Sequence, residues 1–233
     1  MPRAATARTR SERPAKPVKR SETLTERAYR LIEEQIVTLR LRPGDVLSEQ
    51  MLSANLKIGR TPIREALQRL ARERLITVLP RRGIVVSEIN VSTQLRLLEA
   101  RREIERLLAR SGAQRARPEQ RIRFRAIADG MEAAARSGDD KAFLRLDQAF
   151  NLLVLEAAQN DFAAGAMMLM NGLSRRFWYI HYKEAADMPL TARLHAEIAR
   201  AIADGERDKA GAAVDRLLDY IETFTRATLD AQG

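Results

Sequence analysis

The chain has 233 residues, 45% hydrophobic and 31% charged, which is the balance of a folded protein with room for two ordinary domains. It contains no cysteine, which excludes disulfide bonds, thiolate metal sites and cysteine nucleophiles. The net charge of +10 is concentrated at the front, because residues 1–20 carry +6, residues 21–90 carry +3 and residues 91–233 carry only +1.

Residues 1–20 combine seven basic side chains with proline and serine and show no apolar periodicity, so we expect a disordered basic arm. Its charge favours a polyanionic partner such as nucleic acid, and a tail that only improves solubility is the alternative. The N-terminus lacks the apolar centre of a secretory signal, and no apolar run approaches the roughly 20 residues of a membrane span. We therefore expect a cytoplasmic protein with no membrane partner.

Residues 21–90 predict three helices followed by a β-hairpin. The helices are expected at 23–39, from Ser48, and at 62–74, where Thr61 is the expected N-cap and Pro62 the first helical residue. Two β-branched runs, 75–79 and 84–86, flank a turn with two arginines. This order is typical of a winged helix-turn-helix domain.

The third helix has the composition of a DNA-reading helix. Its apolar face points inward, while long hydrogen-bond donors near its N-terminus point outward, where they suit base edges and phosphates. The hairpin adds basic side chains and a glycine. The predicted DNA-binding residues are Arg60, Thr61, Arg64, Gln68, Arg81, Arg82 and Gly83.

From residue 91 to the end, the apolar residues recur at the three-to-four spacing of helices, and the strand-like alternation of apolar and polar residues is absent. Proline and glycine punctuate the pattern, which predicts an antiparallel bundle of six or more helices in a mainly α protein. The expected helices are 91–114, 118–136, 139–159, 161–183, 190–204 and 206–230, and Met167, Met168 and Met170 are expected in the core of the bundle.

Residues 24–87 resemble the DNA-binding domain of the GntR family of transcription regulators. The resemblance rests on the segments 41–45, 47–49, 60–67 and 83–86. It implies that the residues at Arg60, Thr61 and Arg64 contact an operator and that Gly83 lies against the minor groove. Gly59 replaces the Ser or Thr usual in that turn and Gln50 replaces an Arg of some members, so base preference does not carry over.

Residues 91–230 are similar to the all-helical (FCD) ligand-binding domain of the FadR-type subfamily. The similarity rests on Glu99-Ala100-Arg101 with Glu105, on Asp147-Gln148-Ala149-Phe150, and on His195 followed by 201–205. It implies a homodimer that binds a pseudo-palindromic operator, with a small-molecule effector in the helical domain.

Many members of this subfamily hold a divalent metal through one Asp and three His. Here Asp147 and His195 match, but Asn151 and Leu217 occupy the other two positions, so the metal shell is incomplete. Without a metal, polar contacts must hold the effector, for which a carboxylate or sugar acid is expected. The candidate effector residues are Arg101, Asp147, Asn151, His195, Arg175, Arg176 and Tyr179.

The alternative for Arg101 is an intrahelical ion pair with Glu105. For the whole chain, we expect a transcription regulator, with repression as the commoner mode of the family, and not an enzyme. A metal-dependent enzyme is the first alternative, which the two histidines and the incomplete shell disfavour. A non-specific architectural DNA binder is the second, which the large helical region disfavours because non-specific binding needs only charge.

Overall fold

The computed structural model describes residues 22–79, 81, 83–185 and 187–230 of the chain. We use "N-terminal domain" for the described residues of 22–90 and "helical domain" for those of 91–230. Each has its own hydrophobic core. The elements run in the order α1 Leu24–Val37, β1 Val46–Leu47, α2 Glu49–Leu56, α3 Arg60–Arg72, β2 Ile76–Leu79, β3 Gly83–Val86, α4 Val91–Arg115, α5 Pro118–Ser137, α6 Asp140–Ala158, α7 Asp161–Ala185, α8 Met188–Asp204 and α9 Arg207–Asp230.

Local sequence chemistry defines the helices of the N-terminal domain. Thr23 and Glu26 form a reciprocal capping box at the start of α1, and the Ser48 hydroxyl accepts a hydrogen bond from the Met51 amide at the start of α2. The apolar stripes of α1 and α3 bury Ile32, Ile36, Ile63, Ala66 and Leu70 in one core.

The three strands form an antiparallel sheet in the order β1-β3-β2. The hairpin β2–β3 pairs Ile76 with Val86 and Leu79 with Gly83. Gly83 has a φ of +85°, a left-handed conformation that glycine adopts without the steric cost of a Cβ. The two-residue strand β1, which pairs with β3, has no counterpart in the sequence prediction.

The helical domain packs α4 against α9 and α5 against α8 around an alanine- and leucine-rich core. Its helices begin and end within two residues of the predicted positions. The predicted fold class, a winged helix-turn-helix followed by a helical bundle, is therefore confirmed. No helix within the described residues has the length and apolar character needed to cross a membrane.

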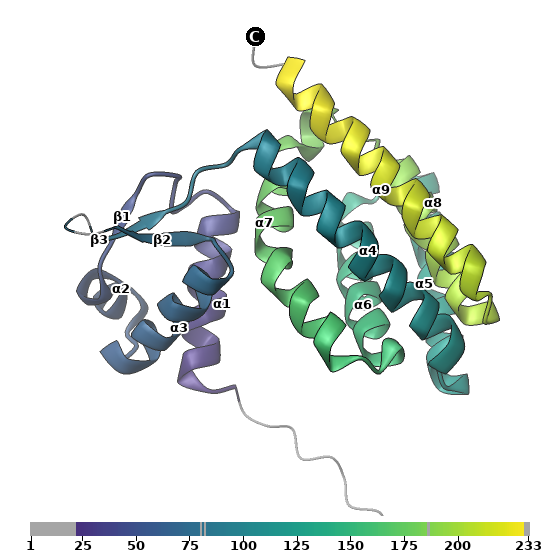
Figure 1. The fold of residues 1–233 in the computed structure, drawn as a ribbon, viewed down its shortest axis with the longest axis horizontal. Helices are drawn as coiled ribbons and strands as arrows, with labels where there is room; N and C mark the ends of the chain where they lie inside the picture. The colour runs from purple at the N-terminus through teal and green to yellow at the C-terminus, as the bar shows by residue number, and fades with distance from the viewer. Residues whose placement is uncertain (1–21, 80, 82, 186, 231–233) are drawn as a thin grey trace, which may run out of the picture.

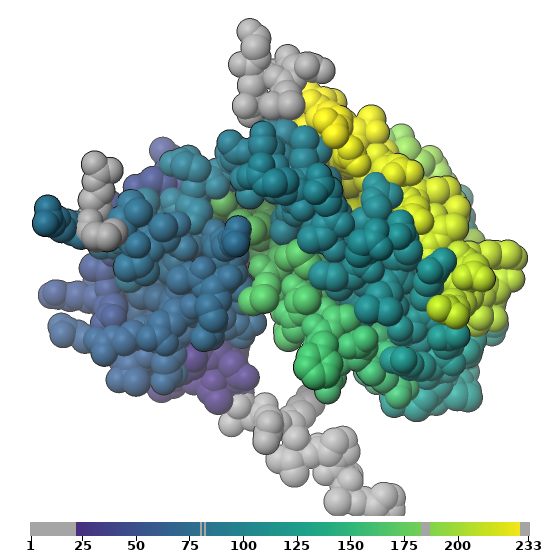
Figure 2. Space-filling view, viewed as in Figure 1, coloured from purple at the N-terminus to yellow at the C-terminus, as the bar shows by residue number. Residues whose placement is uncertain are grey.

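Helix α7 is the part of the helical domain that meets the N-terminal domain (Figure 1). It lies against α1, and in the space-filling view it occupies the space between the two domains (Figure 2). Leu173 packs on the N-terminal core, and the Arg175 guanidinium donates a 2.6 Å hydrogen bond to the Glu33 carboxylate of α1. The two domains are thus joined by side chains as well as by the chain between β3 and α4.

Two local predictions need correction. Helix α3 begins at Arg60, with Gly59 as its N-cap, so Thr61 is not the cap and Pro62 lies at the third helical position. Proline is still tolerated there, because the first-turn N–H groups have no partner within the helix. Met168, expected in the bundle core with Met167 and Met170, is exposed.

Candidate DNA-binding and effector sites

The outward edge of α3 presents polar side chains while its opposite face is buried. Arg60, Thr61, Arg64 and Gln68 are exposed, as the sequence predicted for a reading helix. Helix α2 lies on the side of the N-terminal domain that faces away from the helical bundle, and β2 and β3 run across the domain toward that side (Figure 1). The buried face therefore packs α3 on the core, while the polar edge stays exposed.

The start of α3 suits a phosphate group. Gly59 has no side chain, and among the described residues no capping side chain bonds to this end of the helix. The first-turn amides of Arg60 and Thr61 therefore point out of an uncapped helix N-terminus, where the helix dipole also favours an anion. The replacement of the usual Ser or Thr by Gly59 removes a hydroxyl but leaves these amides accessible.

Glu49 of α2 holds Arg64 in a fixed position. The Nε and Nη2 atoms of Arg64 each donate a 2.8 Å hydrogen bond to the Glu49 carboxylate, a two-pronged pair that restricts the guanidinium. The bond from Arg64, aided by the charges of Arg64 and Arg60, holds the pKa of Glu49 below its ordinary value. Because the Arg64 side chain is still 62% exposed, its other N–H groups remain accessible to DNA.

At the turn of the hairpin, Arg81 is exposed and has a left-handed backbone with a φ of 66°. Gly83 is exposed at the start of β3. Arg82, also predicted to bind DNA, lies outside the described residues, as does the expected basic arm.

In the helical domain, α6 and α8 bring three of the predicted effector residues together. The Oδ1 atom of Asp147 lies 3.2 Å from Nε2 of His195 and accepts a 3.2 Å hydrogen bond from Nδ2 of Asn151. Asp147 and Asn151 meet because residues four apart share one helix face. Phe143 and Phe150 pack edge-on against the His195 ring, with centroids 5.6 and 5.9 Å away.

The His195 ring is oriented by α8 itself. Its Nδ1 atom lies 2.8 Å from the Thr191 carbonyl oxygen, and because a carbonyl only accepts, Nδ1 carries the hydrogen. Nε2 is therefore the nitrogen that faces Asp147. This tautomer leaves Nε2 as the atom for a ligand, once Asp147 is displaced.

These residues do not supply the metal shell that the family resemblance implies. Asn151 is a neutral, poor ligand, and Leu217 is buried in the core of the helical domain. Across the described part of the chain, no three His, Cys, Asp or Glu side chains are grouped so as to hold a metal ion. The donor set of Asp147, Asn151 and His195 thus does not fit a four-coordinate transition-metal site.

Arg101 adopts the alternative that the sequence left open. Its Nε donates a 2.6 Å hydrogen bond to Glu105 one turn along α4, and its Nη1 donates at 2.9 Å to the Ser174 hydroxyl of α7. The side chain is largely buried. Arg101 therefore links α4 to α7 and makes no hydrogen bond to Asp147, Asn151 or His195.

Three other predicted effector residues lie outside the Asp147 cluster. Arg176 donates hydrogen bonds to the Ser87 and Glu88 carbonyl oxygens of the segment that joins the domains. Arg175 pairs with Glu33 at the domain junction, and Tyr179 is exposed on α7. We therefore do not retain them in the effector site.

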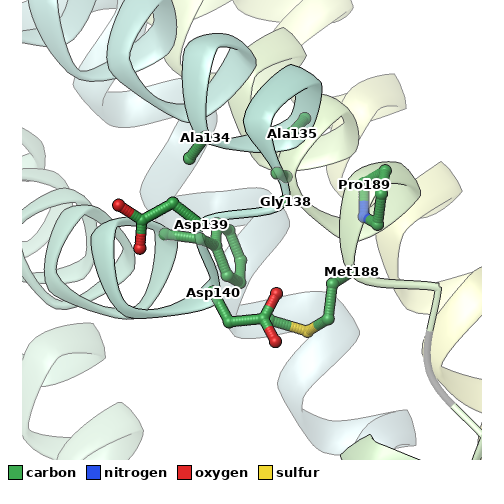
Figure 3. Close-up of a pocket in the computed structure, with 9 residues that line it drawn as sticks. Ala134, Ala135, Gly138, Asp139, Asp140, Met188 and Pro189 are labelled. Atoms are coloured by element: carbon green, nitrogen blue, oxygen red, sulfur yellow. The ribbon is translucent and has the colours of Figure 1, made fainter.

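Two shallow hollows stand out on the described surface. One, of about 170 Å³ and partly open to solvent, lies where α5, α6 and α8 meet; Figure 3 shows Asp139, Asp140 and Met188 around it. The other, of about 280 Å³, lies at the domain junction. These volumes include space that is open to solvent, so neither hollow is an enclosed cavity.

Sequence reasoning missed the acidic partners at the junction and on the reading surface. Glu33 is buried on α1 beside Ile32, so a carboxylate on an otherwise apolar stripe was an available signal. Glu49 gave no comparable signal, because an acidic residue in the first turn of a helix is favourable by itself.

Comparisons with known proteins agree with this architecture. The gntR family of bacterial regulatory proteins matches residues 24–86, and the FCD domain matches residues 96–220. The Nta operon transcriptional regulator of Aminobacter aminovorans is 28% identical over 82% of this chain and 95% of its own length.

Two solved structures share the fold. E. coli McbR/YncC superposes with a TM-score of 0.72 at 16% identity, over 89% of this chain and 99% of its own. A putative transcriptional regulator GntR from Rhodococcus sp. RHA1 superposes with a TM-score of 0.65 at 21% sequence identity. The superposition covers 87% of this chain and 97% of the Rhodococcus chain. The FCD match alone covers more than half of the chain. The chain therefore belongs to the GntR family of bacterial regulatory proteins, with an FCD domain as its helical part, and is a transcription regulator rather than an enzyme.

Proposed function

We propose that the protein binds a pseudo-palindromic operator as a homodimer, reads it with the N-terminal edge of α3, and represses transcription until a small acid binds the helical domain. The observation that carries the DNA-binding part is the open edge of α3. There Arg60, Thr61, Arg64 and Gln68 are exposed beside an uncapped helix start. Arg81, Arg82 and Gly83 of the hairpin add contacts to the neighbouring groove.

Operator binding is tested by fluorescence anisotropy on a sequence selected by the full chain from a random DNA pool. We expect Arg60→Ala and Arg64→Ala each to weaken binding by about 1–3 kcal/mol, because each removes a guanidinium that can contact bases or phosphates. Arg72→Ala is the matched control, since Arg72 is exposed at the far end of the same helix. Equal affinities for all four proteins would assign DNA binding to another surface.

The proposed effector site is the cluster of Asp147, Asn151 and His195. Asp147 and the Nε2 atom of His195, whose ring hydrogen is on Nδ1, can accept hydrogen bonds from hydroxyl groups, and the Asn151 amide can donate to a carboxylate, which suits a hydroxy acid or sugar acid that carries both groups. Arg101, two helices away in sequence, is the proposed cation of the site if its bonds to Glu105 and Ser174 open.

A thermal-shift screen of hydroxy acids and sugar acids tests this site, because a ligand that binds the native state raises its melting temperature. We expect the shift to vanish in Asn151→Leu and to persist in Asp140→Asn, which alters an exposed carboxylate at the start of the same helix. Repression is tested in a reporter strain, where the chain should lower expression and the identified acid restore it.

Exposed apolar side chains on α6 and α7 support the homodimer. Leu144 and Leu152 lie two turns apart on α6, and Phe162 of α7 is 93% exposed. Exposed apolar surface of this kind marks an interface when it is contiguous. We expect Leu152→Glu to produce monomers in sedimentation velocity, and Ile122→Glu, an equally exposed position on α5, to leave the dimer intact.

A further inference from the structure

The hollow at the domain junction lies between the segment that joins the domains, the first turns of α4, and α7. It has a volume of about 280 Å³ and is partly open to solvent. Its polar lining comes from Glu88, Asn90, Thr93, Gln94 and Arg176, and its apolar lining from Ile89, Leu97, Leu173 and Phe177.

Arg176 is a buried cation in this hollow. The residue is only 2% exposed, and its guanidinium donates hydrogen bonds to two carbonyl oxygens of the joining segment, at 2.8 Å to Ser87 and 3.1 Å to Glu88. No carboxylate of the described chain forms an ion pair with it. Burial lowers the pKa of Arg176 to about 10, although the nearby Glu88 charge acts in the opposite direction.

Two neutral carbonyls satisfy hydrogen bonds but do not neutralise the charge. A buried charge with no carboxylate hydrogen-bonded to it is expensive, because Glu88 acts on Arg176 only through its nearby charge, and burial of this kind in a hollow is a feature of binding sites. Arg175, its neighbour, shows the contrast, because it is exposed and yet has the Glu33 carboxylate as its partner.

The start of α4 adds positive potential to the same space. Asn90 is the N-cap of this helix and accepts a 3.0 Å hydrogen bond from the Thr93 amide, and both residues line the hollow. The N-terminus of a long helix favours a nearby anion. Glu88 is the one acidic lining residue; it is exposed, and its Oε1 lies near Gly44 of the N-terminal domain.

We propose that this junction hollow is an anion site that takes a small carboxylic acid, with Arg176 as its counter-ion. The carboxylate would meet the guanidinium and the polar start of α4, and a short apolar tail would contact Leu97, Leu173 and Phe177. Because the 280 Å³ includes space open to solvent, the hollow can cover only a small acid and not a long acyl chain or a nucleotide. The hollow in Figure 3 offers no such site, because its charged lining residues, Asp139 and Asp140, repel an anion.

A ligand bound in the junction hollow would affect the DNA-binding surface through the segment that joins the domains. A bound carboxylate competes with the Ser87 and Glu88 carbonyls for Arg176, and so changes how α7 holds the segment that leads out of the hairpin. This regulatory consequence rests on the proposed function, whereas the binding itself does not.

The test uses the single tryptophan of the chain, Trp178, which lies two residues from Arg176 on α7. The full chain is titrated with propionate and benzoate at constant ionic strength, with propionamide and benzamide as uncharged analogues. We expect a saturable change in fluorescence and a rise in melting temperature with at least one acid and with neither amide. Concentrations extend to about 10 mM, ten times a Kd of roughly 1 mM.

Arg176→Gln should abolish the response, and Arg176→Lys should weaken it at least about tenfold, because an ammonium lacks the two-pronged geometry of a guanidinium. If Arg176→Gln does not fold, Leu97→Phe narrows the hollow without touching the cation and should also abolish binding. Asp147→Asn is the matched control at the other candidate site and should leave the response unchanged.

Absence of a response to both acids, or an equal response to the amides, overturns the proposal. So does a response that survives Arg176→Gln or is abolished in Asp147→Asn. Operator binding, measured without acid, separates these outcomes from the proposed function, since it depends on α3 and not on occupancy of the hollow.

Discussion

Substitution of Gly172 by alanine tests how tightly the two domains are packed together. A Cβ at position 172 would lie 2.6 Å from Cδ1 of Leu75, a fully buried residue of the N-terminal core. Contacts this short force neighbouring atoms to move, and overpacking of a filled core costs about 1–3 kcal/mol. Gly165, on the same helix, has no heavy atom within 4 Å of the corresponding position and is the matched control.

Both substitutions gain about 1 kcal/mol from the higher helix propensity of alanine. Gly165→Ala should therefore stabilise the protein by about that amount, whereas Gly172→Ala should range from neutral to about 2 kcal/mol destabilising. At about 2–4 °C per kcal/mol for a chain of this size, calorimetry should separate the two melting temperatures by several degrees.

A double substitution identifies the cause. Leu75→Ala removes the methyl group that the new Cβ would meet, so Gly172→Ala in that background should behave like Gly165→Ala. If Gly172→Ala stabilises the wild-type chain as much as Gly165→Ala does, the close approach of α7 to the N-terminal core is wrong.

Other contacts lead to four further predictions. Burial, the largest effect on Glu33, raises its pKa above the ordinary 4.5, so the folded state binds this proton more tightly than the unfolded state. The stability of wild type relative to Glu33→Gln should therefore fall as pH rises from about 4.5 through the raised pKa, in urea titrations at several pH values; a flat difference would contradict the burial of Glu33. Arg121 donates hydrogen bonds to carbonyl oxygens at the ends of α4 and α8, including those of Ala113 and Ala203. Arg121→Ala should therefore lower the free energy of unfolding, measured in denaturant, by about 2–4 kcal/mol. A loss below about 0.5 kcal/mol would show that these bonds do not stabilise the fold. Glu49→Gln removes a negative charge and frees Arg64, so it should raise the affinity for random DNA and lower the ratio of operator affinity to random-DNA affinity, both measured by anisotropy. An unchanged ratio would contradict a role for Glu49 in positioning Arg64. Deletion of residues 1–20 should make the plot of the logarithm of the DNA-binding constant against the logarithm of salt concentration less steep, by about 0.9 for each phosphate that the arm neutralises in the full chain. An unchanged slope would favour a tail that only improves solubility.

The elements were predictable because their signals are local. Ser48 caps α2, Pro118 starts α5, and Gly138 and Gly205 end their helices in left-handed conformations, as the residue types require. The strand β1 was not predictable from such signals. It consists of two residues, and it exists because Val46 pairs with Val85 almost 40 residues later.

The contacts in the candidate sites also divide into those set by local spacing and those set by long-range packing. Asp147 and Asn151 share a helix face by spacing alone, and the pair of Arg101 with Glu105 is also a spacing effect. The partner of Arg175 depends instead on how α7 packs against α1, 142 residues earlier in the chain. No local pattern distinguishes an arginine of a binding site from an arginine of a domain junction.

One turn of α7 therefore contacts the helical domain and also the N-terminal domain with the segment that joins the two. Ser174 bonds to Arg101 of the helical domain, while Arg175 and Arg176 hold α1 and the segment between the domains. Under the proposed function, a ligand that repositions Arg101 would break its bond to Ser174, and a shift of this turn of α7 would then also move Arg175, whose guanidinium faces Glu33. Because Glu33 is buried, removal of its partner leaves an uncompensated charge, which typically costs several kcal/mol. That cost is comparable to the 1–3 kcal/mol by which allosteric effectors usually change affinity. Under the proposed function, the polar turn at 174–176 is therefore the place where ligand binding in the helical domain would change the contacts that hold the N-terminal domain.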